Sequence, residues 1–324
     1  MRAYRALAAA AAALALVVVV TGAYVRLSDA GLGCPDWPGC YGRLTPAQAA
    51  SDIERSVAAQ GGEHGPVSVA KAWKEMGHRY VAATLGLVIV LLAAWSWVLR
   101  RAPLVPTFAA AVVVFQATLG MWTVTLLLKP AIVTTHLLGG MLTLALLVWI
   151  ALAQWRFAAA PRSRALRLPA ALGLAALAVQ IALGWVSANY AALACPDLPL
   201  CLGEAVPPMD FANAFHVLRE LGQTPQGELL SREALTAIHW THRAFALVVF
   251  GTVGWAALKA LRLSKLLAVL IAALLVLQLS LGVASVALGL PLALAAAHNA
   301  GAALLLASLV VLNFFAFRGL CPSW

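Results

Sequence analysis

Long, uninterrupted apolar runs dominate the pattern of hydrophobic and polar positions along the chain. A helix needs about 20 apolar residues to cross a hydrocarbon core of roughly 30 Å. The runs reach that length and are too long, and too rich in Leu and Ala, for the strands of a membrane barrel. They predict an all-α membrane protein with eight transmembrane helices, at 6–27, 78–99, 104–126, 132–155, 168–190, 236–258, 266–289 and 292–317.

The polar segments between the runs differ in length. Two are long, at 28–77 and 191–238, and the others are short. The long segments mix Pro, Gly, Gln and charged residues, which predicts small caps with some helix, for example over Phe211 to Leu221. The first run follows Arg2 and Arg5 as a signal peptide would, but it is long for one and no clear cleavage site follows, so we expect a retained helix.

The distribution of charge indicates how the chain is oriented across the membrane. Only 10% of the residues are charged, and the formal net charge is +10. If the loops are sorted by side, one side holds twelve basic residues and no acidic one, and the other holds ten basic and all twelve acidic residues. This positive-inside bias predicts cytoplasmic termini and extracytoplasmic long loops in the cell membrane. The basicity is therefore an orientation signal in a lipid bilayer, and no nucleic-acid partner is expected.

Four features of the first half recur in the same order in the second half, which indicates an internal duplication. The two copies suggest tandem four-helix bundles, 1–160 and 161–324, related by a pseudo-twofold axis along the membrane normal. The features recur 161 to 164 residues later: Cys34–Cys40 as Cys195–Cys201, His78-Arg79 as His242-Arg243, Gln116-x-x-Leu-Gly120 as Gln278-x-x-Leu-Gly282, and His136 as His298. Gln180-x-x-Leu-Gly184 repeats the glutamine motif once more, and helix packing is its expected role.

Matched histidines are the main candidates for chemistry. Each unit has one near the outer end of its second helix and one about 10 Å below the outer end of its fourth. Neighbouring helices can hold such a pair on opposite sides of one flat macrocycle, as bis-histidine heme ligation requires. Hydrogen bonding between helices is the alternative, but two matched pairs at costly membrane positions favour ligation. Zinc is disfavoured, because no carboxylate or thiol lies at that depth. The four are His78, His136, His242 and His298.

The two units differ three residues before the first histidine of each pair. Glu75 stands there in the first unit and His239 in the second. A carboxylate at a heme edge can take a proton or stabilise developing positive charge, whereas a histidine there can hydrogen-bond a heme propionate. The alternative for Glu75 is a solvated loop carboxylate paired with Lys71 or Lys74. The alternative for His239 is similar: a side chain without a role at the heme.

The paired cysteines lie in the long loops, on the side that permits disulfides. Proline on both sides of the intervening residues favours a tight turn that brings two sulfurs together. For Cys195–Cys201 we expect a structural disulfide. For Cys34–Cys40 a structural clamp and a redox role beside the heme both stay open.

Taken together, these residues resemble the heme A synthase family over essentially the whole chain. The residues that carry the likeness are Cys34-Pro-Asp-Trp-Pro-x-Cys40, Glu75-x-x-His78-Arg79, His136, His242-Arg243 and His298. The resemblance implies oxidation of a methyl group of heme O to a formyl group by successive hydroxylations, which gives heme A for terminal oxidases.

The resemblance also implies a division of labour between the halves. A heme b cofactor would lie between His242 and His298, with His239 beside it, and the substrate heme O between His78 and His136. Glu75 and the pair Cys34 and Cys40 would complete the catalytic set. A heme O synthase is the implied supplier of substrate, and an oligomer is compatible with the pattern. Two alternatives stay open: a diheme b-type electron-transfer protein that exchanges electrons with quinol, and a thiol-oxidising membrane protein that uses the cysteine pairs.

Overall fold

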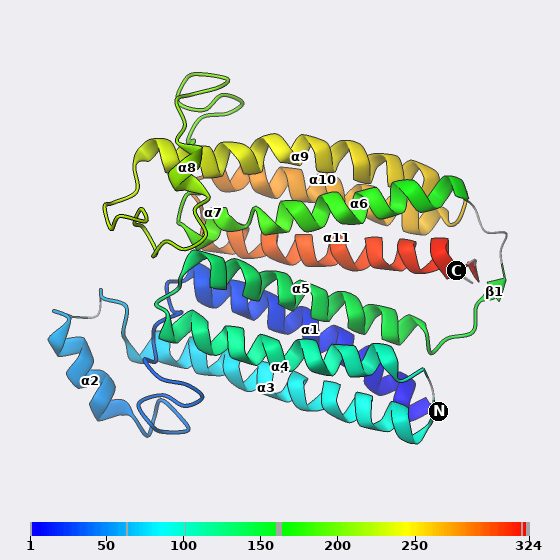
Figure 1. The fold of residues 1–324 in the computed structure, drawn as a ribbon, viewed down its shortest axis with the longest axis horizontal. Helices are drawn as coiled ribbons and strands as arrows, with labels where there is room; N and C mark the ends of the chain where they lie inside the picture. Colours follow the sequence, from blue (N-terminus) through cyan, green and yellow to red (C-terminus); the bar gives the residue numbers. More distant parts are fainter. Residues whose placement is uncertain (1, 63, 101, 160–163, 319, 322–324) are drawn as a thin grey trace.

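The computed structural model describes residues 2–62, 64–100, 102–159, 164–318 and 320–321. Eight helices in this part are long and apolar enough to cross a membrane, and they run back and forth along one direction (Figure 1). This confirms the predicted helical architecture. The eight are α1 (Arg2–Leu27), α3 (Val69–Val98), α4 (Leu104–Thr125), α5 (Pro130–Leu152), α6 (Arg164–Ala182), α9 (Arg232–Ala260), α10 (Lys265–Ala287) and α11 (Leu292–Arg318).

The two ends of the bundle differ. Both chain termini lie at one end, here called the termini end, and the two long connections lie at the other, here called the loop end (Figure 1). The loop end carries three short helices, α2 (Ala50–Ala59), α7 (Trp185–Ala188) and α8 (Phe211–Ala214). The helix expected over 211–221 is thus limited to one turn. At the termini end, β1 (Ala158–Ala159) and β2 (Leu320–Cys321) form a two-residue antiparallel pairing, a small addition to the all-helical expectation.

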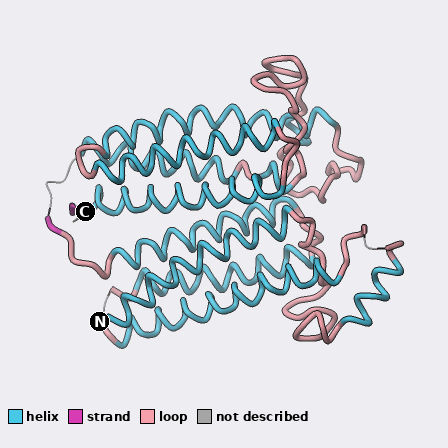
Figure 2. The backbone as a smooth tube through the Cα atoms, turned by 180° about the vertical axis from the view of Figure 1, so that it is seen from behind, coloured by secondary structure: helices cyan, strands magenta, loops and turns pink. Residues whose placement is uncertain are grey.

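The long helices form two groups of four that lie side by side in both views of the backbone (Figures 1 and 2). The first group is α1, α3, α4 and α5, and the second is α6, α9, α10 and α11. Helix α11 joins them, because it contacts α1 and α5 of the first group. The proposed boundary between residues 160 and 161 falls in 160–163, outside the described residues, as do Arg101 and Arg162 of the basic loops.

Helix α3 begins nine residues, about two and a half turns, before the apolar run that predicts it, and α9 begins four residues, about one turn, before its run. Their N-cap residues explain the difference: the Ser68 hydroxyl accepts from Lys71 N at 3.2 Å, and the Ser231 hydroxyl accepts from Ala234 N at 3.1 Å. A serine that accepts from the backbone N–H three residues later fixes the first turn of a helix even when that turn is polar. The first histidine of each pair therefore lies well inside its helix, not at its start.

The fifth crossing is interrupted near the loop end. The apolar run predicts one helix over 168–190, but α6 ends at Ala182 and α7 starts at Trp185. The Gly184 N–H bonds the Ile181 carbonyl at 2.8 Å, three residues back, which tightens the last turn. The apolar span nevertheless continues over Ala165–Ala188.

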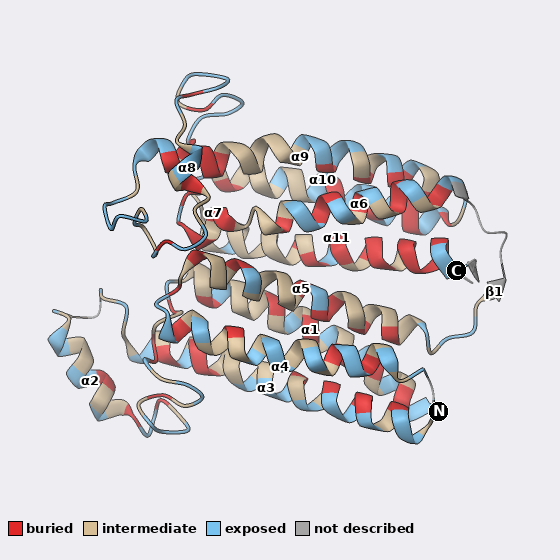
Figure 3. Cartoon of the chain, in the orientation of Figure 1, coloured by how far each residue is buried: buried red, intermediate tan, exposed pale blue. Residues whose placement is uncertain are grey.

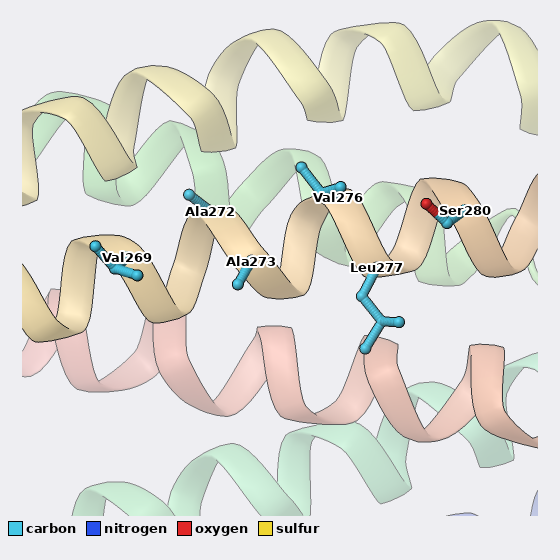
Figure 4. A pocket seen from close by; sticks show the side chains of 6 residues that line it. All are labelled: Val269, Ala272, Ala273, Val276, Leu277 and Ser280. Carbon is cyan, nitrogen blue, oxygen red and sulfur yellow. The ribbon is translucent and has the colours of Figure 1, made fainter.

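The outer surface of the long helices is apolar, as a bilayer environment requires. Exposed and buried positions alternate around most helices, whereas α11 is mostly buried over its half toward the termini end (Figure 3). One shallow groove of about 580 Å³ runs along α10 on the exposed side (Figure 4). Its lining is almost wholly apolar, which suits a lipid chain: Val269, Ala272, Ala273, Val276, Leu277 and Ser280.

Candidate functional site

The first histidine pair lies inside the first group of helices, toward the loop end. His78 projects from α3 onto α1, where a Cβ added at Gly22 would stand 2.8 Å from its ring. His136 projects from α5 onto α4, where a Cβ at Gly120 would stand 3.3 Å from its ring. Glycine at these positions thus leaves the space that each imidazole occupies.

The second pair repeats this arrangement in the second group. His242 on α9 and His298 on α11 have ring centroids 6.5 Å apart and ring planes 65° apart. A Cβ at Gly282 of α10 would stand 3.3 Å from the His298 ring, the same distance as at the matching position of the first pair. The two imidazoles that sequence spacing paired are therefore neighbours in space.

Glutamine side chains hold the helices that carry the second histidine of each pair. Gln116 Nε2 donates to the His136 carbonyl at 2.8 Å, and a Cβ at Gly139 would overlap the Gln116 amide. Gln278 stands in the same relation to Gly301. These contacts agree with the packing role predicted for the motif.

Gln180 and Thr21 touch the first histidine of each pair, and sequence reasoning missed both contacts. Gln180 Nε2 lies 3.2 Å from His242 Nε2 and donates to the His242 carbonyl at 3.0 Å. Thr21 Oγ1 lies 3.2 Å from His78 Nδ1 and donates to the Val17 carbonyl at 2.9 Å. Because the Thr21 proton is used within its own helix, the hydroxyl is free to accept from His78. Such contacts fix the orientation of an imidazole ligand.

The second pair has a spacing that suits two imidazoles on one metal ion. Metal–imidazole bonds are about 2.0–2.1 Å long, so two rings on one metal have centroids roughly 6–6.5 Å apart, and the second pair meets this. The Nδ1 atoms of His136, His242 and His298 are buried and have no hydrogen-bond partner among the described residues. A buried nitrogen without a partner calls for a ligand or an ion. Within the described part of the chain, no group of three or more His, Cys, Asp or Glu side chains is placed to hold a metal ion.

Glu75 and His239 perform the same structural task. Glu75 is buried and its Oε2 accepts from the Cys34 backbone N–H at 2.9 Å, while Oε1 forms an ion pair with Arg79. His239 is equally buried, and its Nδ1 accepts from the Cys195 backbone N–H at 3.1 Å. Both side chains therefore clamp the first cysteine of a pair to the helix. The Glu75 carboxylate is neither solvated nor paired with a lysine, which rules out the form of passive role considered from the sequence.

The cysteine loops are built alike around disulfides. Cys34 and Cys40 have an S–S distance of 2.05 Å, and Cys195 and Cys201 one of 1.96 Å, and all four are buried. This confirms both predicted pairings. Burial keeps the sulfurs away from external thiols as long as the loop stays closed.

An arginine after the first histidine of each pair anchors these loops. Arg79 Nη1 donates to the carbonyls of Asp36 at 2.8 Å and Gly39 at 2.5 Å. Arg243 Nη1 donates to the Asp197 carbonyl at 3.0 Å. The repeated His-Arg dipeptide marks these positions in the sequence, but only the structure gives the arginines a role: they join each disulfide loop to the helix that carries a candidate ligand.

Comparison with known proteins identifies the family of this chain. The model of the cytochrome oxidase assembly protein family COX15-CtaA matches residues 5–310. A heme A synthase of Shewanella oneidensis is 44% identical over 313 residues, 92% of each chain. One of Symbiobacterium thermophilum is 31% identical over 261 residues, which cover 75% of this chain and 78% of that protein. One of Caulobacter sp. is 27% identical over 316 residues, 90% and 89% of the two chains. Because the match spans nearly the whole sequence, the chain belongs to the COX15-CtaA family of cytochrome oxidase assembly proteins.

Proposed function

We infer that this chain is a heme A synthase, which oxidises a methyl group of heme O to the formyl group of heme A. Its relatives over most of the chain carry that name. The observation that carries the inference is the pair of imidazoles on α9 and α11, whose spacing suits one iron. A second pair, on α3 and α5, likewise packs against glycines of neighbouring helices. A single heme-binding role would need one such pair.

We propose that the two pairs have different occupants. His242 and His298 would ligate a heme b cofactor, and His78 and His136 would hold the heme O substrate. Heme b supplies one-electron transfer when bound. The different side chains at positions 75 and 239 support this division, because two hemes that only transfer electrons would not need different neighbouring groups. The domain boundary near residue 160 follows from the same proposal.

Glu75 is the proposed proton acceptor of the substrate site. Oxidation of a methyl to a formyl group removes hydrogen from the carbon as protons and electrons. The electrons pass to an electron acceptor, and a fixed carboxylate can receive one of the protons. Glu75 lies three residues before His78 on α3, so the two share a helix face. Its Oε2 is held by the Cys34 N–H, and Arg79 beside Oε1 stabilises the ionised form. The Cys34–Cys40 loop thus takes part at least by positioning this carboxylate.

The orientation in the membrane is also a proposal. The loop end would face the extracytoplasmic side and the termini end the cytoplasm, because the basic residues without acidic neighbours gather at the termini end. The matched contacts of the two groups, down to Gly120 with His136 and Gly282 with His298, support a duplicated unit with a pseudo-twofold axis. We further propose that a heme O synthase in the same membrane delivers the substrate.

Supplying heme O to the purified protein with an electron acceptor tests the function. We expect a formyl heme, identified by its mass and by the absorption of its pyridine complex. If heme O is recovered unchanged while quinol reduces two bound hemes, the chain is a diheme electron-transfer protein instead. If product forms after both cysteine pairs are replaced but not after His136→Ala, thiol oxidation is not its chemistry.

A further inference from the structure

Arg26 is a cation of α1 that the proposed site does not yet use. It follows Gly22, the glycine beneath the His78 ring, by four residues. Residues four apart share one helix face, and the rise between them is about 6 Å. Arg26 therefore lies one turn beyond the candidate ligand, toward the loop end.

The guanidinium of Arg26 is only partly satisfied. Its Nη2 donates to the Ala188 carbonyl at 3.1 Å, and its central carbon lies 3.9 Å from the centroid of the Tyr190 ring. Its Nε and Nη1 are buried and have no hydrogen-bond partner among the described residues. Two buried donor nitrogens without a hydrogen-bond partner are costly.

The nearby carboxylate is already committed to other groups. Asp29 Oδ2 pairs with Lys71 Nζ at 2.9 Å, and Asp29 Oδ1 accepts from the Tyr190 hydroxyl at 3.2 Å. Burial raises the pKa of the Tyr190 phenol, which keeps it protonated and able to donate. Within the described ranges, no carboxylate lies at ion-pair distance from Arg26.

We propose that Arg26 binds a propionate carboxylate of the heme held at His78. This rests on the proposed function, and it adds the group that recognises the acidic edge of the substrate. A propionate is the anionic part of a heme, and Arg is the side chain that best satisfies a carboxylate. With Arg26 one turn beyond the imidazole, the propionates point toward the loop end and the rest of the macrocycle toward the bilayer interior.

The second group of helices holds this cation in place. Ala188 is the last residue of α7 and Tyr190 follows it by two residues, so the break before α7 brings a carbonyl and an aromatic face onto α1. Cation–π contact and the carbonyl orient the guanidinium and leave Nε and Nη1 for the ligand. The substrate site of the first group is thus completed by residues of the second.

The test compares binding of ferric heme O with that of its propionate dimethyl ester, which has the same ring and tail but no negative charge. The full-length protein, with its heme b in place, is studied in nanodiscs of uncharged lipid by absorption titration. We expect wild type to bind heme O about tenfold or more tighter than the ester, the range of a charge-assisted hydrogen bond. Arg26→Gln should remove this preference, Arg26→Lys should keep part of it, and the exposed control Arg55→Ala should keep all of it.

The outcomes separate this proposal from the function on which it rests. If wild type binds heme O and ester equally, or if Arg26→Gln keeps the preference, Arg26 does not bind the propionate, although the chain still binds heme O. If wild type binds neither, the proposed function itself is wrong. If anionic lipid in the nanodisc abolishes the preference of wild type by competition, the cation is a lipid headgroup site and the proposal is overturned.

Discussion

The Glu75 carboxylate accepts a hydrogen bond from the backbone N–H of Cys34 at 2.9 Å. This bond joins the helix that carries a candidate heme ligand to a disulfide loop. The matching contact, His239 with the Cys195 N–H at 3.1 Å, shows that the position clamps a loop in both groups. A carboxylate in the first group and an imidazole in the second therefore share a structural role. What distinguishes Glu75 is its charge, which is paired with Arg79.

Replacing Glu75 with Gln separates these two roles. The amide oxygen can still accept from the Cys34 N–H, but the charge is gone. We expect formyl heme production to fall at least about 100-fold, the size of a general acid–base contribution, with heme b content unchanged. Product analysis and a thermal unfolding curve measure both. His239→Gln, in the second group, is the control. If it lowers activity as much as Glu75→Gln does, Glu75 serves only to hold the cysteine loop and the prediction is wrong.

The two disulfides should differ in their effect on activity. Replacing Cys195 and Cys201 with Ser removes a short cross-link and should lower the free energy of unfolding by about 2 kcal/mol, with heme A formation retained. Replacing Cys34 and Cys40 should lower stability by a similar amount and also lower activity, because Glu75 loses its fixed partner. Denaturation midpoints and product yields check this. Equal activity in both double variants would contradict it.

The glycines beneath the imidazoles should tolerate no side chain. At Gly22 a Cβ would stand 2.8 Å from the His78 ring, so Gly22→Ala must displace that ring. A side chain forced off its rotamer costs about 0.5–1.5 kcal/mol, and we expect heme O affinity to fall roughly two- to tenfold. Gly86→Ala on α3 is the matched control, because its Cβ would make an ordinary contact at 3.9 Å. Equal heme O affinities in the two variants would show that the His78 ring, which packs on Gly22, is not a ligand.

The orientation can be measured with single accessible cysteines in a Cys321→Ser background. Ala58 is exposed on α2 at the loop end, and Ala153 is exposed at the termini end. A membrane-impermeant maleimide added to intact cells should label Ala58→Cys and spare Ala153→Cys until the cells are opened. The reverse pattern would invert the proposed orientation.

Sequence periodicity predicted the eight crossings well, because an apolar run of sufficient length has few other structures in a membrane. It placed the starts of α3 and α9 too late, since their first turns are polar; the serine caps Ser68 and Ser231 were the signal that could have corrected them. The short helix α2 (Ala50–Ala59) lies in a segment for which only some helix was expected.

The site was predictable only where the duplication marked it. Repeated His, Gln and His-Arg positions identified the candidate ligands and glutamines, and the cysteine pairing followed from their spacing. Thr21 and Gln180 contact matching histidines, but from positions of α1 and α6 that do not match in the repeat, and Arg26 reaches the Ala188 carbonyl of α7. A contact between elements distant in the chain leaves no periodic pattern in a single sequence.

The most direct test of two unlike heme sites is the heme content of ligand variants. Hemes B, O and A are extracted from wild type, His136→Ala and His298→Ala proteins, each produced together with a heme O synthase, and separated by chromatography. We expect heme B and heme A in wild type, heme B without heme A in His136→Ala, and loss of heme B in His298→Ala. Loss of heme B in His136→Ala with heme A retained, or heme B alone in wild type despite a supply of heme O, would contradict this assignment.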